Sequence, residues 1–91
     1  MTQHTLKLND KYFDAVKKGK KTFEIRYNDR DYHIGDELRM YRTDENGEPV
    51  HNSSGYKDWV VGTVEYIITD QELPFGLKEG FVVLGFVLER S

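Results

Sequence analysis

The stretch that decides the fold is Gly19-Lys20-Lys21-Thr22-Phe23-Glu24-Ile25-Arg26, which runs on into Tyr27-Asn28-Asp29-Arg30-Asp31. Apolar and polar residues alternate from Thr22 to Tyr27, which predicts a half-buried β-strand. One face carries the apolar side chains, Phe23, Ile25 and Tyr27. The other carries the polar ones, Thr22, Glu24 and Arg26. We expect this charged face to look outward into a hollow beside the preceding helix.

The residues before this strand predict a short strand followed directly by a helix. Leucines alternate with polar residues from Thr5 to Leu8, which indicates the strand. Asn9 is a favourable N-cap, and Phe13 and Val16 recur at helical spacing on one face. Gly19 supplies the left-handed conformation that ends a helix. The helix therefore delivers the chain through a lysine-rich turn into the strand.

The residues after this strand alternate between turn signals and strand patterns. Polar turns are predicted over residues 28–31 and 35–36, and residues 43–57 form the longest loop or an extended hairpin. Further strands are predicted over residues 37–41, 59–68 and 81–88. Gly62 marks a bulge or a close approach within the second of these. The last is almost wholly apolar and is expected to be buried on both faces, with a bend at Gly85.

These elements define one domain over residues 1–91. Five to six strands with one or two short helices predict an α+β fold built on a small mixed β-barrel. Closure of the barrel would remove the exposed strand edges that so short a chain would otherwise carry. A flat sheet backed by the helix satisfies the same periodicity and stays open as an alternative.

Composition and charge limit the classes of function. The net charge is −3, but residues 1–30 carry a balance of +4 and residues 31–91 a balance of −7. Extensive binding to nucleic acid is therefore disfavoured, whereas a localised basic edge or an ordinary lysine-rich surface is compatible with this balance. The chain has no cysteine and no apolar run of about 18 residues, which predicts a cytoplasmic protein without disulfides or a membrane span. His4, His33 and His51 lack metal-ligand spacing, so neither a metal nor a cofactor is predicted.

The central stretch resembles a known family when it is taken with a late Gly-Leu-Lys-Glu-Gly-Phe-Val-Val-Leu-Gly run over residues 76–85. The whole pattern is similar to the ASCH group of the PUA-like superfamily, and more closely to the DUF3850 family of bacterial and phage proteins of unassigned function. The resemblance covers essentially the whole chain. It implies a PUA-like β-barrel with a cleft beside the helix and the strand after it, where ASCH relatives are proposed to bind RNA or a nucleotide.

One branch of that group removes the acyl group from N4-acetylcytidine with a lysine, a threonine and a glutamate. The resemblance places its lysine on Lys21 and its catalytic threonine on Glu24, whereas Thr22 matches a threonine that is not catalytic. Glu72 corresponds to its glutamate by position only. An amidohydrolase mechanism would therefore make Lys21 the nucleophile or base and Glu24 its acid/base partner.

The chemistry of the polar face supports either a ligand site or a structural ion pair. Glu24 would accept hydrogen bonds from a nucleobase, and Arg26 would clamp a phosphate or stack on a base. The same two residues would equally pair with each other. Lys21 would contact a phosphate or act as a base, or it is an exposed surface charge. Thr22 offers a hydroxyl to a substrate or is a simple strand residue, and Lys20 adds charge to the turn.

Two further groups complete the candidate site. Asn28, Asp29 and Arg30 either surround a ligand with donors or only cap their own turn. Among the aromatic residues, Tyr56 and Trp59 are the expected stacking pair for an unpaired base. The leading hypothesis is a module that binds RNA or a nucleoside. The alternatives are an amidohydrolase on N4-acetylcytidine-like nucleosides and a phage or bacterial protein-interaction module in which Glu24 and Arg26 are only structural.

Overall fold

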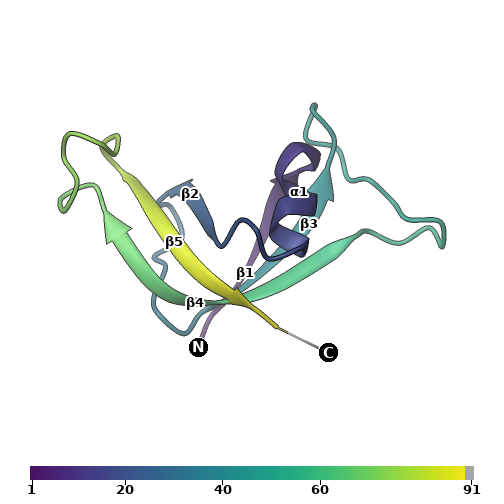
Figure 1. Ribbon diagram of the computed structural model, residues 1–91, viewed down its shortest axis with the longest axis horizontal. Coiled ribbons are helices and arrows are strands. Elements are labelled where there is room, and N and C mark those ends of the chain that lie inside the picture. Colours follow the sequence, from purple (N-terminus) through teal and green to yellow (C-terminus); the bar gives the residue numbers. More distant parts are fainter. Residues whose placement is uncertain (90–91) are drawn as a thin grey trace.

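The computed structural model describes residues 1–89. Its elements in chain order are β1 (Gln3–Asn9), α1 (Asp10–Lys17), β2 (Phe23–Tyr27), β3 (Glu37–Thr43), β4 (Trp59–Thr69) and β5 (Phe81–Leu88). The strands form a single sheet in the order β1-β3-β4-β5-β2, which curls into a half-barrel with α1 at one end (Figure 1). The predicted α+β class is confirmed, with five strands and one α-helix in the described part of the chain.

The sheet is mixed, and its two ends approach each other. β1 pairs with β3 in parallel, and every other pairing is antiparallel. β1 and β2 are therefore the two edges of the sheet. Arg26 on β2 donates from Nη2 to the backbone carbonyl of Lys7 on β1. We call the space between these edge strands the seam, since a side chain rather than a strand ladder spans it.

The helix begins and ends where the sequence predicts. The side chain of Asn9 accepts a hydrogen bond of 2.8 Å from the backbone N–H of Lys11, which satisfies one free donor of the first turn. Gly19 adopts a φ of 76°, a left-handed conformation that a residue with a Cβ rarely takes. Phe13 and Val16 are buried and fix the helix against the sheet.

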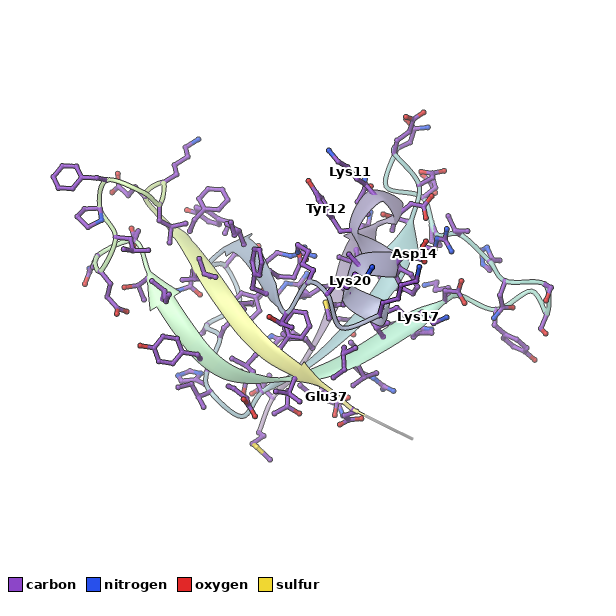
Figure 2. The ribbon with its side chains drawn as sticks, in the orientation of Figure 1. Lys11, Tyr12, Asp14, Lys17, Lys20 and Glu37 are labelled. Carbon is purple, nitrogen blue, oxygen red and sulfur yellow. The ribbon has the colours of Figure 1, made fainter. Side chains whose placement is uncertain are left out.

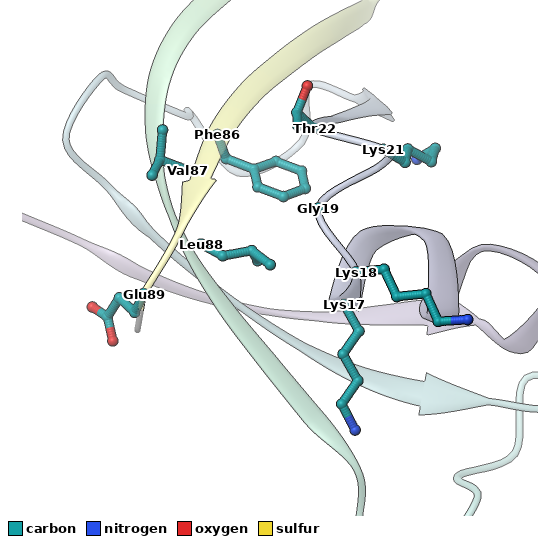
Figure 3. Close-up of a pocket in the computed structure, with 9 residues that line it drawn as sticks. All are labelled: Lys17, Lys18, Gly19, Lys21, Thr22, Phe86, Val87, Leu88 and Glu89. Carbon is teal, nitrogen blue, oxygen red and sulfur yellow. The ribbon is translucent and has the colours of Figure 1, made fainter. Parts of the chain in front are cut away.

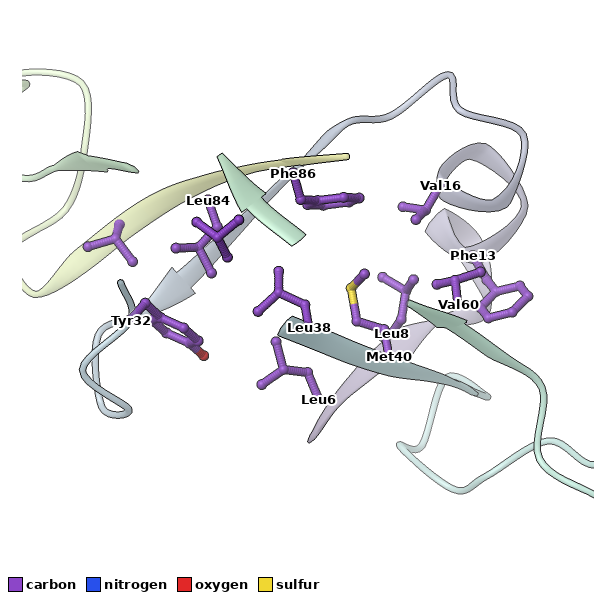
Figure 4. Close-up of a cluster of buried hydrophobic side chains, with 12 residues drawn as sticks. Leu6, Leu8, Phe13, Val16, Tyr32, Leu38, Met40, Val60, Leu84 and Phe86 are labelled. Atoms are coloured by element: carbon purple, nitrogen blue, oxygen red, sulfur yellow. The ribbon is translucent and has the colours of Figure 1, made fainter. Parts of the chain in front are cut away.

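The hydrophobic core fills the inside of the curled sheet (Figure 4). β1 and β3 contribute Leu6, Leu8, Leu38 and Met40, and these meet side chains from β4, β5 and α1. All four leucine and methionine side chains are 2% exposed or less. Because β1 and β3 are parallel and in register, their buried residues form two adjoining rows.

The expectation about the faces of β2 is wrong, because the polar face of this strand points inward. Glu24 is opposite Leu84 and Arg26 is opposite Val82, and directly opposed residues share a face of the sheet. Both β5 residues belong to the core, so Glu24 is only 6% exposed. The apolar face points outward, with Ile25 53% and Tyr27 57% exposed.

In β4 the structure selects one of the two expectations for Gly62, and in β5 it differs from expectation. The register shift in β4 lies between Val64 and Tyr66, so the bulge is there and not at Gly62. Gly62 is instead a close approach, because a Cβ at that position would lie 2.9 Å from the ring of Phe86. β5 is buried on one face only, since Val87 on its other face is 52% exposed. The open outer side of the half-barrel explains this difference.

Residues 44–58 form an extended arm rather than a compact loop (Figure 1). Isolated bridges join Thr43 to Pro49 and His51 to Lys57. Asp44 and Asn52 hold the two turns of the arm through side-chain bonds to backbone N–H groups. The predicted extended hairpin is confirmed.

Candidate functional site

Glu24 is the centre of an ion cluster at the edge of the sheet. Its Oε1 accepts from the ammonium of Lys21, and its Oε2 lies 3.3 Å from Nε of Arg26. The Glu24 side chain is 8% exposed, whereas those of its two partners are 19% and 25% exposed. Lys21, Glu24 and Arg26, which the sequence analysis placed in the candidate site, therefore do converge. Both oxygens of the carboxylate are occupied by cations of the same chain.

The Lys21 ammonium has partners on several sides. Nζ donates to the carbonyl of Phe23 at 2.7 Å and to Glu24. It also lies 5.1 Å from the ring centroid of Tyr12 and 4.9 Å from that of Phe23, where ring quadrupoles attract a cation. Tyr12 comes from α1 (Figure 2), and it lines a hollow of about 350 Å³ together with Lys21, Phe23, Glu24 and Ile25.

A second hollow, of about 300 Å³, lies at the seam between β1 and β2. Its lining combines three cations with three tyrosines, and these are Lys7, Arg26, Arg30, Tyr27, Tyr32 and Tyr41. Asp29 also lines it and is 3.9 Å from Arg30, which leaves the hollow with a positive balance. Arg26 joins this hollow to the Glu24 cluster, since the same guanidinium contacts Glu24 and the Lys7 carbonyl.

Tyr32 forms the buried wall of the seam hollow. It is 7% exposed, and its ring lies 4.7 Å from that of His4 with a tilt of 55°. Burial raises the pKa of Tyr32 above its ordinary value, although the nearby charges of Arg26 and Arg30 act in the opposite direction. The hydroxyl therefore stays protonated at neutral pH and is able to donate as well as accept.

Aromatic side chains continue from the seam hollow along the outer face of β3 and β4. The ring centroids of Tyr41 and Trp59 are 5.3 Å apart. The ammonium of Lys57 lies 4.5 Å from the Tyr41 ring and 5.9 Å from the Trp59 ring. Because Tyr41 also lines the seam hollow, the two groups form one strip of alternating cations and rings.

A third hollow, of about 610 Å³, lies between the end of α1 and the end of β5 (Figure 3). Lys17 and Lys18 border it on the helix side, and Phe86 and Leu88 point toward it from β5. Lys21 borders it too, but its side chain points away from Phe86. This hollow is thus an apolar depression with lysines at its margin.

The structure distributes the remaining predicted residues over several places. Asp29 and Arg30 join the seam hollow. Thr22 borders the third hollow, where its carbonyl accepts from Phe86 N–H at 3.0 Å, and Lys20 is exposed in the same turn. The backbone N–H of Asn28 bonds to the Gly80 carbonyl at 2.8 Å, which supports a structural role.

The structure places Tyr56 and Trp59, the two residues expected to stack on an unpaired base, in different surroundings. Tyr56 is 72% exposed on the arm of residues 44–58, whereas Trp59 packs against Tyr41 on the sheet. The arm leads away from the sheet after β3 (Figure 1). The rings of Tyr41 and Trp59 come from paired strands, since Tyr41 is directly opposite Trp59 in the register of β3 and β4.

Sequence reasoning named neither Lys7 nor Tyr12 as a site residue, and it preferred Tyr56 and Trp59 to the tyrosines that line the seam hollow, which are Tyr27, Tyr32 and Tyr41. Lys7 belongs to the seam hollow and Tyr12 to the hollow around Lys21. Strand alternation does place Lys7 on the face opposite the buried leucines of β1, but it does not reveal that β1 and β2 lie across a seam. Only the sheet order carries that information.

Two kinds of feature do not occur within residues 1–89. No group of three or more His, Cys, Asp or Glu side chains in this range is arranged to hold a metal ion. None of the helices in this part of the chain has the length and apolar character needed to cross a membrane.

Fold and site together define a small α+β half-barrel with a positively charged, tyrosine-lined seam. Residues 3–86 match the family model described as domain of unknown function DUF3850, and the chain belongs to this family. It is also similar to an uncharacterised 12.9 kDa protein in the GpA 3′ region of Escherichia phage P2, with 50% identity over 38 residues. That match covers 42% of this chain and 35% of the phage protein, about a third of its length.

Proposed function

We propose that this chain binds single-stranded RNA or a nucleoside at the seam between β1 and β2. The observation that carries the proposal is the composition of the seam hollow, where three cations and three tyrosines line about 300 Å³. Phosphates are bound by cations, and unpaired bases stack on aromatic rings at about 1 to 3 kcal/mol per base. The strip formed by Tyr41, Trp59 and Lys57 would extend this contact to neighbouring nucleotides.

The net charge of the chain supports a short single strand as the ligand rather than a long duplex. A protein with a net charge of −3 gains little from sequence-independent binding along a duplex backbone. A local positive hollow with stacking rings needs only one or a few nucleotides. The resemblance to the ASCH group of PUA-like proteins supports the same class of ligand, and a cytoplasmic location, predicted from the cysteine-free composition, suits it.

The test is a titration with fluorescein-labelled hexanucleotides of RNA, followed by fluorescence anisotropy at several salt concentrations. Arg30→Ala is the informative variant, because this side chain is 46% exposed and its removal leaves the Glu24 cluster intact. We expect about fivefold weaker binding. The plot of log affinity against log salt should become less steep by about 0.7, because one phosphate contact is lost. Lys17→Ala removes the same charge at the exposed end of α1 and is the matched control, with less than a twofold effect.

Amide chemical shifts locate the site independently of these variants. Added RNA is expected to shift the amides of residues 5–7 and 26–32. Unchanged shifts in both segments contradict the proposal. Equal effects of Lys17→Ala and Arg30→Ala contradict it as well, because they indicate binding through overall charge alone.

The amidohydrolase alternative depends on Lys21 and stays a prediction. The carboxylate, the carbonyl and the two rings all contact Nζ, so a substrate carbonyl would have to displace these partners to meet Lys21 as a nucleophile. Glu72, the residue that corresponds by position to the third catalytic group, lies in the loop after β4 and accepts from the backbone N–H of Thr69, the last residue of that strand. Incubation with N4-acetylcytidine and chromatography for cytidine tests this alternative, and Lys21→Ala should abolish any turnover.

A further inference from the structure

The outer side of the sheet carries an uncharged apolar surface that the proposed function does not use. It extends over β2, β5 and the end of β4, where Ile25 is opposite Val83 and Val83 is opposite Ile68. Directly opposed residues share a face, so these three side chains form a row across the strands. Tyr66 on β4 adjoins this row and is 61% exposed. We call this surface the outer apolar face.

The loop of residues 70–80 adds apolar side chains beside this face. It joins β4 to β5 at the end of the sheet away from α1 (Figure 1). Leu73 is 46% exposed and Phe75 is 104% exposed. Scattered exposed apolar residues are normal on a protein, but neighbouring ones on three paired strands and their connecting loop are typical of a binding surface.

Acidic residues lie at the end of the outer apolar face formed by β4, β5 and their connecting loop, and they favour one kind of partner. Residues 65–80 contain four acidic residues and one lysine. Glu65, Glu72 and Glu79 are exposed, and Glu65 is at the bulge next to Tyr66. An acidic border repels RNA and anionic lipid headgroups, and it also opposes a second copy of the same surface. It attracts a polypeptide in which apolar residues are interspersed with lysine or arginine.

We propose that the outer apolar face and the adjoining loop dock a basic, apolar segment of a protein partner. The apolar side chains of the segment cover Ile25 and Phe75, and its cations pair with Glu65 and Glu79. This surface adjoins the seam hollow through Tyr27, which shares the outward face of β2 with Ile25, but Glu65, Phe75 and Glu79 do not line that hollow. The chain then carries two neighbouring sites of opposite charge preference.

The experiment uses three labelled 12-residue peptides, followed by fluorescence anisotropy: alternating Leu and Lys, alternating Leu and Glu, and alternating Ser and Lys. The Leu/Lys peptide is expected to bind at least about tenfold more tightly than the other two, since it alone satisfies both features of the surface. Ile25→Ser and Phe75→Ser should each weaken its binding about fivefold. Glu79→Gln should weaken it by a smaller factor.

Matched controls distinguish peptide binding at this surface from nonspecific binding to the rest of the protein. Ile34→Ser removes a side chain that is 64% exposed in the turn before β3, and Glu45→Gln removes an exposed acid on the arm. Both should change peptide affinity less than twofold. Equal binding of the Ser/Lys and Leu/Lys peptides, or no effect of Ile25→Ser and Phe75→Ser, overturns the proposal.

Two further measurements distinguish peptide docking from self-association and from RNA binding. If sedimentation velocity shows self-association that Ile25→Ser abolishes, a second copy occupies the surface and the proposal is overturned. RNA binding should be unchanged in Phe75→Ser, which keeps the outcome of this test distinct from that of the seam. A near-ultraviolet circular dichroism spectrum confirms that each variant is folded.

Discussion

Two side-chain carboxylates are buried within residues 1–89, and their surroundings differ in kind. Asp36, which is 3% exposed, accepts from the backbone N–H groups of Thr2 and His33 at 3.2 and 2.9 Å and from the ring of His4 at 2.8 Å. Glu24, which is 6% exposed, is held by the side chains of Lys21 and Arg26. One carboxylate therefore binds mainly backbone, and the other binds only cationic side chains.

This difference indicates that Asp36 stabilises the fold, whereas Glu24 positions the cations of the site. The bonds to Asp36 tie the first residues of the chain to the turn before β3, which fixes the start of β1 against its parallel partner. Glu24 ties no distant backbone together. It fixes the positions of two cations beside the hollows of the site. One of them, Arg26, also donates a hydrogen bond across the seam to the carbonyl of Lys7. We expect the fold to depend more on Asp36 and ligand binding more on Glu24.

The largest expected effect in this comparison is that of Asp36→Ala on stability. The substitution leaves the buried ring of His4 and two part-buried backbone N–H groups without their partner. Leaving a buried donor unpaired costs about 1 to 3 kcal/mol, and part-buried donors that reach water cost less, so we expect a loss of about 2 to 3 kcal/mol. Urea unfolding followed by circular dichroism measures it, and a loss below about 1 kcal/mol would contradict the structural role.

The next effect is that of Glu24→Gln, which keeps the shape and removes the charge. Lys21 and Arg26 both retain access to water, so the stability loss should be about 1 to 2 kcal/mol, less than for Asp36→Ala. RNA affinity should also change, because both cations lose their fixed positions. Asp36→Asn is the matched control, and a larger effect on RNA binding from it than from Glu24→Gln would break the comparison.

The sequence predicts local structure well because local structure depends on neighbouring residues. Asn9 and Gly19 bound α1 as expected, since a cap needs only a side chain or a φ value at one position. Alternation likewise locates β1 and β2. The alternation in β2 does not reveal which face is buried, because that depends on β5, whose Leu84 and Val82 lie opposite Glu24 and Arg26.

Only part of the candidate site is predicted from the sequence, because only some of its contacts join residues that are close in sequence. Lys21, Glu24 and Arg26 are close in sequence, so their convergence follows from one strand and one turn. Lys7 reaches the seam only because β1 and β2 are the two edges of one curled sheet. Trp59 meets Tyr41 because of the register between β3 and β4. Such contacts between distant residues are absent from any single periodic pattern.

A smaller effect is expected for Arg26→Lys, which keeps the charge and shortens the reach. A lysine cannot contact Glu24 and the Lys7 carbonyl together with the geometry of a guanidinium. The loss of one hydrogen bond predicts about 1 kcal/mol of destabilisation. Amide hydrogen exchange should increase along β1 near the seam. Arg39→Lys, whose partner Glu37 lies on the same strand, is the control and should leave exchange in β1 unchanged.

The smallest expected effect is on the pH dependence of stability in acid, to which Asp36 contributes. Burial acts to raise the pKa of Asp36, but the hydrogen bonds from His4, His33 and Thr2 outweigh it and hold the pKa below its ordinary value. The folded state therefore releases this proton more readily than the unfolded state, whose pKa is about 3.9. The resulting stability is present above about pH 4 and is lost as the pH falls through the folded pKa. Urea unfolding from pH 6 to pH 2 should show this decline. Asp36→Asn should flatten it, and an equally steep decline in that variant would assign the effect to other carboxylates.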